Sequence, residues 1–174
     1  MAIIITEREG EVRIFTEKDG LLSAVAHDLE LGVERFRIEW DDARAKLTAT
    51  FDTRSLRVLH PIVRGAPSPS SLSSKDLRKI EENIQRDVLA TARHPEVRFE
   101  SSAIEPDGEG YRLTGTLTLH GTSRPLTARA SRIGDRFVTE LTLDQREFGI
   151  TPYSAMMGTL KIKPLVRVRV RVPV

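Results

Sequence analysis

Few side chains in this sequence combine the residue types and the spacing that enzyme chemistry requires. The four histidines, His27, His60, His94 and His120, show no ligand-like spacing, and cysteine is absent. The sequence also lacks a Gly-x-Ser-x-Gly nucleophile turn, a glycine-rich phosphate loop and a His-Glu-x-x-His pair. We therefore expect no catalytic residues, no metal site and no cofactor, and we predict that the protein is not an enzyme.

His27 is the histidine whose position favours a role inside the fold. It shares the alternating phase of Leu29 and Leu31, so its side chain is expected to point inward with theirs. A histidine on an apolar face is most often a core residue satisfied by a hydrogen bond. The alternative is that its ring donates to the polar end of a bound molecule, and both interpretations stay open.

Tyr153 begins a second polar stretch. Its hydroxyl and that of Ser154 are candidate hydrogen-bond donors to a polar head group. Met156 and Met157 follow, and their flexible thioethers suit a surface that repacks around apolar shapes of different form. This stretch is therefore a candidate pocket mouth, with ordinary loop packing as the equal alternative.

The elements that must position these side chains are predicted by alternation of apolar and polar residues. Near the C-terminus Val166, Val168, Val170 and Val172 alternate with arginine, the pattern of a strand with one buried face. The same alternation marks residues 36–40, 47–51, 112–119 and 137–143. Turn sequences such as Lys18-Asp19-Gly20 separate strands by about 8 to 12 residues, which indicates an antiparallel sandwich or barrel.

One stretch departs from this pattern and predicts a helix over about residues 74–89. Ser73 and Asp76 have the spacing of a capping box at the helix start. Leu77, Ile80, Ile84 and Val88 then fall on one helical face, while residues 65–74 before them form a loop. We expect the helix to pack at the side or end of a mainly β domain that spans residues 1–174.

Four stretches, in order along the chain, resemble the YceI-like family, the lipocalin-like polyisoprenoid-binding proteins. Residues 115–127, Gly-Thr-Leu-Thr-Leu-His-Gly-Thr-Ser-Arg-Pro-Leu-Thr, are similar to the hairpin of that family. The other three are residues 51–56, 94–101 and 146–150. The resemblance covers roughly residues 20–174. The usual family opening with Trp and a His-Ser pair is missing, and the 65–89 segment is longer and more charged.

The resemblance implies a single antiparallel lipocalin-like barrel of about eight strands. It also implies an elongated apolar interior that holds a long-chain polyisoprenoid, an isoprenoid quinone or another amphiphilic lipid for sequestration or transport. The candidate ligand-binding residues are the inward-facing positions together with the stretch around Tyr153: Val25, His27, Leu29, Phe36, Ile38, Trp40, Phe51, Phe99, Leu117, Leu119, Phe137, Leu141, Phe148, Tyr153, Met156, Met157 and Val168.

Two other functions remain as alternatives, because alternation does not distinguish a lined pocket from a filled core. The first is a structural or interaction module with a solid core, and the second, less favoured, is an enzyme acting on a lipid-like substrate. The net charge of +2, from 27 Lys and Arg against 25 Asp and Glu, argues against a nucleic-acid partner.

Charge and terminal sequence also bear on location and partners. The row Arg167, Arg169 and Arg171 either attracts anionic lipid surfaces or keeps the outer face of a strand soluble. Residues 1–9 lack the pattern of a signal peptide, and no apolar run approaches the roughly 18 residues of a membrane span. We predict a cytoplasmic protein, and the resemblance leaves open a homodimer and a transient contact with a membrane surface.

Overall fold

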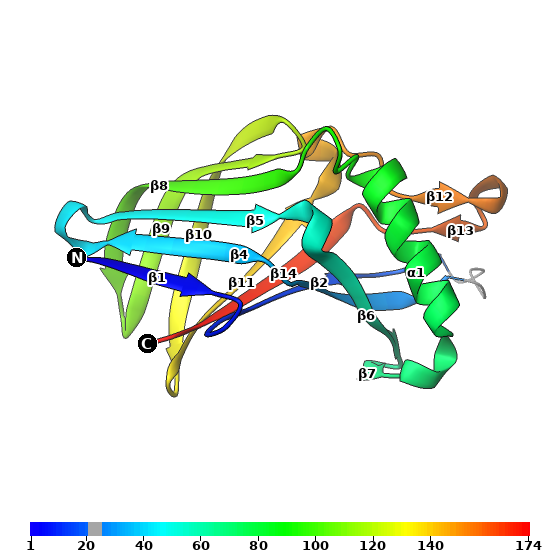
Figure 1. The fold of residues 1–174 in the computed structure, drawn as a ribbon, viewed down its shortest axis with the longest axis horizontal. Helices are drawn as coiled ribbons and strands as arrows, with labels where there is room; N and C mark the ends of the chain where they lie inside the picture. The colour runs from blue at the N-terminus through cyan, green and yellow to red at the C-terminus, as the bar shows by residue number, and fades with distance from the viewer. Residues whose placement is uncertain (21–25) are drawn as a thin grey trace.

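The computed structural model describes residues 1–20 and 26–174, and most of them belong to one curled antiparallel sheet (Figure 1). Among the described residues the sheet has twelve strands, in the order β1-β4-β5-β8-β9-β10-β11-β14-β2-β3-β6-β7. The strands are β1 (Ala2–Thr6), β2 (Glu11–Thr16), β3 (Asp28–Val33), β4 (Phe36–Asp41), β5 (Lys46–Asp52), β6 (Leu56–Val63), β7 (Ala66–Pro67), β8 (Glu96–Asp107), β9 (Gly110–Leu119), β10 (Thr122–Ile133), β11 (Arg136–Asp144) and β14 (Leu165–Pro173).

Short elements complete the chain. β12 (Ser154–Ala155) and β13 (Leu160–Lys161) form a separate two-stranded sheet. The remaining turns of helix are η1 (Asp42–Arg44), η2 (Thr53–Ser55), η3 (Pro69–Ser71), η5 (Gln145–Phe148) and η6 (Met156–Gly158). No helix in the described part of the chain combines the length and apolar character needed to cross a bilayer.

A mainly β fold with one main helix is confirmed, but the strand count differs from the expected eight or so. The added strands include the two ends of the pairing order, β1 and β7. β1 reads Ala-Ile-Ile-Ile-Thr, a continuous apolar run without alternation, and β7 has only two residues. Within the described residues β1 and β7 do not pair with each other, so the curled sheet forms a half-barrel.

Period-two alternation places the apolar side chains on the inner face of the sheet, as predicted. In the pairing of β11 with β14, Leu141 lies opposite Val168 and Phe137 lies opposite Val172. The arginines between these valines face outward and contact the neighbouring strand β2. There Arg169 lies 3.7 Å from a carboxylate oxygen of Glu11, and the Arg167 guanidinium lies 4.4 Å from the centre of the Phe15 ring.

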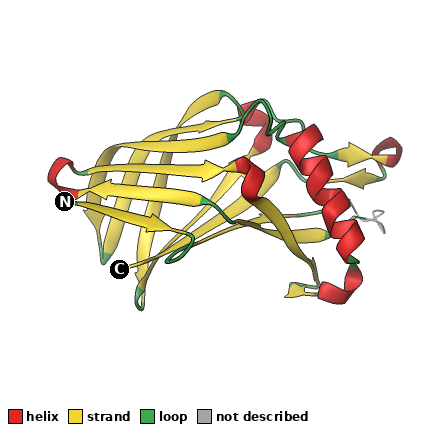
Figure 2. Cartoon of the chain, in the orientation of Figure 1, coloured by secondary structure: helices red, strands yellow, loops and turns green. Residues whose placement is uncertain are grey.

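Helix α1 (Ser74–Asn83) lies at one end of the curled sheet, and a π-helical turn, η4 (Ile84–Val88), continues it (Figure 2). The predicted capping box is present: the Ser73 hydroxyl accepts from the Asp76 N–H at 3.1 Å, and Asp76 accepts from the Ser73 N–H at 3.0 Å. The apolar face of the helix, including Leu77, Ile80 and Ile84, packs against the core. The helix therefore closes an end of the sheet.

Gly115, the first residue of the family-like hairpin, marks a close approach of two strands. A Cβ atom at Gly115 would lie 2.1 Å from the Glu100 carbonyl oxygen and 2.8 Å from the Phe99 ring. The β8–β9 register shifts beside it, between Ser101 and Ala103. The glycine thus allows β8 to bend across β9, which keeps the sheet curled.

We predict that Gly115→Ala destabilises the fold by about 2 kcal/mol or more, because the added methyl group must displace the backbone of β8. Urea unfolding measures this change. Thr116→Ala is the matched control, since Thr116 is exposed on the same strand and its truncation leaves the strand contact intact. Equal stability of the two variants would show that the close approach at Gly115 does not constrain the sheet.

Candidate functional site

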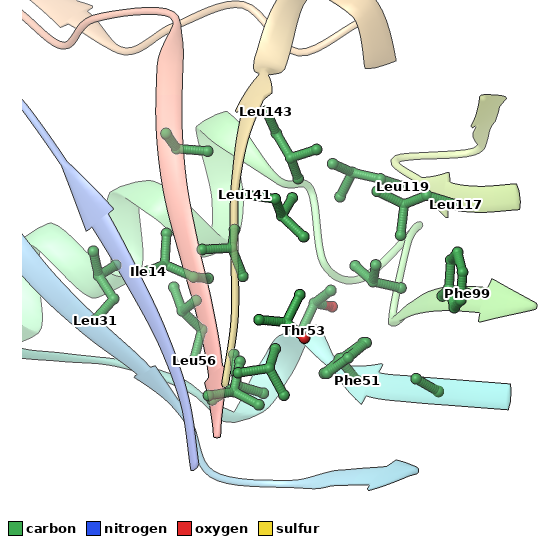
Figure 3. A pocket seen from close by; sticks show the side chains of 18 of the residues that line it. Ile14, Leu31, Phe51, Thr53, Leu56, Phe99, Leu117, Leu119, Leu141 and Leu143 are labelled. Carbon is green, nitrogen blue, oxygen red and sulfur yellow. The ribbon is translucent and has the colours of Figure 1, made fainter. Parts of the chain in front are cut away.

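A cavity of about 770 Å³ runs through the interior of the curled sheet (Figure 3). This volume lies within the range of roughly 300 to 1,000 Å³ that is typical of small-molecule sites. Apolar side chains from nearly every long strand make up its wall, and Figure 3 shows Leu117, Leu119, Leu141 and Leu143 around it. The interior is therefore lined rather than filled.

The wall consists of strands because alternation sends every second side chain inward. Phe51 on β5, Phe99 on β8 and Leu117 on β9 stand on three successive neighbours in the sheet. β11 and β14 supply leucines and valines on the far side. A surface held by ladder hydrogen bonds is preformed, so a ligand need not order it on binding.

Polar side chains reach the cavity mainly at the end that α1 covers. The Asn83 amide donates to the Tyr153 hydroxyl at 3.2 Å, and both residues line the cavity. His27 is half-buried on the wall, while Lys79 and Asp76 are exposed at its edge. Hydrogen bonds from the Ser73 hydroxyl and N–H lower the pKa of the Asp76 carboxyl.

Two other polar side chains on the wall bond to the backbone, whereas the buried Thr16 hydroxyl and Trp40 indole N–H, also on the wall, have no hydrogen-bond partner among the described residues. The Thr53 hydroxyl donates to the His94 carbonyl at 2.8 Å, and the Gln145 amide donates to the Lys163 carbonyl at 3.2 Å. The bond from Thr53 uses its only donor hydrogen, and the bond from Gln145 uses one of the two on its amide nitrogen. The arrangement suits a ligand with a largely apolar body.

Three aromatic rings line the cavity at the end opposite α1. Tyr111 on β9 contacts Trp40 on β4 edge-on, with ring centres 5.4 Å apart, and Phe137 on β11 at 5.6 Å. The turns of the β4–β5 and β8–β9 hairpins lie at this end in Figure 1. The cavity thus has an aromatic end and a polar end.

Most of the sequence-predicted ligand-binding residues stand on the cavity wall. Those on the wall are His27, Leu29, Ile38, Trp40, Phe51, Phe99, Leu117, Leu119, Phe137, Leu141, Tyr153 and Val168. Val25 lies outside the described residues, and so does the side chain of Met156.

Three predicted residues lie away from the wall, as does the candidate donor Ser154. Phe36 is buried in the core beside the β1–β2 turn, where a Cβ at Gly10 would lie 3.2 Å from its ring. Phe148 is buried in the core on η5. Met157 is fully exposed in a left-handed turn with φ 57°, and Ser154 is exposed on β12. Alternation predicts the face of a strand but not the direction of such turns.

Sequence reasoning missed Asn83 and Lys79 at the polar end. Both are on α1, and Asn83 stands three residues after Ile80 on the predicted apolar face of the helix. A polar residue on that face was a signal that the helix covers something other than a solid core. The hydrogen bond to Tyr153 could not be expected, because 70 residues separate the two in sequence.

Two histidine rings contact each other in a tilted arrangement outside the cavity, which the sequence did not indicate. The rings of His94 and His120 have centres 4.3 Å apart, and they join the loop after η4 to the β9–β10 turn. Burial and the neighbouring His94 lower the pKa of His120. Within residues 1–20 and 26–174 no three His, Cys, Asp or Glu side chains group as a metal site.

Solved structures of similar shape share this architecture at low sequence identity. Burkholderia cenocepacia BcnA matches with a TM-score of 0.62, 18% identity and 94% of both chains covered. A polyisoprenoid binding domain from Saccharophagus degradans, implicated in plant cell wall breakdown, matches with a TM-score of 0.59 at 10% identity, over 99% of this chain and 98% of the other. These likenesses establish the fold alone.

Curated relatives match parts of the sequence more closely. A UPF0312 protein of Pectobacterium carotovorum is 33% identical over 116 residues, which are 61% of this chain and 52% of that protein. Protein YceI of Escherichia coli O157:H7 is 42% identical over 48 residues, 28% of this chain and 25% of the other. The chain spans about half or less of the length of these relatives.

The family model described as the YceI-like domain matches residues 15–174, nearly the whole chain. That match includes the strands that wall the cavity from β3 to β14, as well as helix α1. The protein therefore belongs to the YceI-like family.

Proposed function

We propose that the protein binds a long-chain apolar ligand, a polyisoprenoid or an isoprenoid quinone, and sequesters or transports it without chemical change. The cavity of about 770 Å³ with its predominantly aliphatic and aromatic wall carries this proposal. Transfer of a chain from water to such a site is favourable by roughly 0.8 kcal/mol for each buried CH₂ group. Binding of this kind needs apolar shape and no reactive side chain.

The polar end of the ligand is assigned to the α1 end of the cavity. Asn83 and Tyr153 already form a hydrogen-bonded pair there, and the exposed Lys79 adds a positive charge at the edge. A hydroxyl, carbonyl or phosphate oxygen at this end would accept from these groups, while the chain extends toward Trp40. The ligand therefore has one orientation.

The relatives support the proposal without testing it. The Saccharophagus degradans domain is a polyisoprenoid binding domain, and this chain shares its fold. A solid-core module requires side chains that fill the interior, whereas the described side chains leave a large volume open. A homodimer, contact with a membrane surface and a cytoplasmic location stay predictions.

A polyprenol is predicted to raise the melting temperature of the purified protein by about 5 to 10 °C at a free concentration near 100 times the dissociation constant. Ala128→Trp should abolish this shift, because Ala128 lines the cavity and an indole would occupy its volume. Thr127→Trp is the matched control, since Thr127 is exposed one residue earlier on the opposite face of β10. Equal shifts for the two variants would place the ligand outside the cavity.

Tyr153→Phe is predicted to weaken binding of a polyprenol by about fivefold, since a hydrogen bond to a polar end contributes roughly 1 kcal/mol. The same variant should bind squalene, a hydrocarbon without a polar end, as the unmodified protein does. Isothermal titration with both compounds measures the difference. If the variant loses affinity for squalene and polyprenol equally, Tyr153 contributes packing and the assigned orientation is wrong.

A further inference from the structure

The wall of the cavity is incomplete at the end opposite α1. Ile3 on β1 pairs in register with Trp40 and shares its inward face with Ile5, which packs against the core. Although it faces inward and lines the cavity, the Ile3 side chain is 49% exposed. An inward-facing side chain is this exposed only where the cavity reaches solvent.

The end of β14 reaches the same region of the cavity. Val170 and Val172 on β14 face the cavity, and Val174 follows them in the same phase. Val174 also lines the cavity, yet it is 56% exposed. Its N–H donates to the Asp135 carbonyl at 3.1 Å, so the terminal residue is held at the β10–β11 turn.

The sheet order explains why the opening lies here. β1 is one end of that order, and within the described residues no strand pairs with its outer edge. Arg136 at the start of β11 donates to the Glu9 carbonyl in the β1–β2 turn. This hydrogen bond connects β11 to the turn that follows β1. Figure 1 shows both chain termini at this end, away from α1.

The two ends of the cavity differ in chemistry. Among the described residues, the exposed side chains on the cavity edge at the α1 end are Lys79 and Asp76, both charged. At the β1 end they are Ile3, Ile4 and Val174, all apolar, together with the charged Glu9 of the β1–β2 turn. The apolar part of the β1 rim offers a chain a partly buried path out of the cavity, whereas the charged rim at the α1 end favours a polar head group.

We propose that the cavity is a tunnel with a second mouth at β1, the β1 mouth, formed by Ile3, Ile4 and Val174, through which the distal end of a long polyisoprenoid emerges. This inference rests on the proposed function. It extends the ligand class to chains longer than the cavity itself. Affinity then continues to rise with chain length after the cavity is filled, with a smaller gain for each added unit because the emerging part is only partly buried.

The test uses three all-trans polyprenols, farnesol, geranylgeraniol and solanesol, with the full-length protein in isothermal titration. A second form of solanesol carries a fluorophore at its distal end, and iodide serves as a soluble quencher. The proposal expects the unmodified protein to bind solanesol most tightly and iodide to quench the bound fluorophore nearly as well as the free one. A fluorophore shielded from iodide in the complex would overturn the second mouth.

Ile3→Trp provides the matched perturbation, because an indole at this inward position narrows the β1 mouth. We expect the affinity of this variant for solanesol to fall about tenfold or more, which corresponds to the loss of burial of roughly two methylene groups, and its affinity for farnesol to fall by a smaller factor. Ala2→Trp is the control, since Ala2 is exposed on the same strand and does not line the cavity. Equal solanesol affinity of all three proteins would overturn the proposal.

The outcomes separate this inference from the proposed function. Binding of farnesol and geranylgeraniol without binding of solanesol by the unmodified protein means that the cavity holds isoprenoids but ends at β1. That result overturns the second mouth and leaves the proposed function in place. Failure of all three polyprenols to bind overturns both.

Discussion

The structure depends on one constraint. An interior that stays open needs a wall of apolar side chains, and the backbone N–H and C=O groups of that wall must hydrogen-bond to one another within it. A curled antiparallel sheet meets this requirement because its ladder bonds run along the wall and its side chains alternate across it. Leu141 opposite Val168 on β11 and β14 shows the arrangement directly. Two polar side chains on the wall between its two ends, Thr53 and Gln145, donate to backbone carbonyls.

The same constraint explains the role of helix α1. An open end of the sheet would expose the apolar interior to water, and the helix covers it with Leu77, Ile80 and Ile84. The capping box at Ser73 and Asp76 fixes the start of the helix at the surface. Asn83, one turn beyond Lys79, brings an amide to the cavity and pairs with Tyr153 from a distant loop. Helix α1 thus both covers one end of the cavity and brings polar side chains to it.

Local patterns in the sequence predicted much of this architecture, and their limits are physical. The valines of β14 alternate so regularly that both their strand and their inward face could be predicted, and the helix cap followed from Ser73 and Asp76. β1 was missed because Ala-Ile-Ile-Ile-Thr has no alternation. Phe36 was predicted to contact the ligand because alternation places it on the inward face of β4. Its ring packs in the core beside the β1–β2 turn. The pairing of Asn83 with Tyr153 and the gap beside Ile3 depend on tertiary contacts that no local pattern encodes.

The central claim is that the cavity holds a long apolar molecule, and mass spectrometry of an organic extract tests it most directly. The protein is purified without detergent from its native host, alongside a mock purification, and both extracts are analysed for lipids. The account predicts a long-chain isoprenoid in near-stoichiometric amount in the protein sample alone. An extract without lipid above the mock sample, from protein that also takes up no isoprenoid when incubated with membranes of that host, would contradict it.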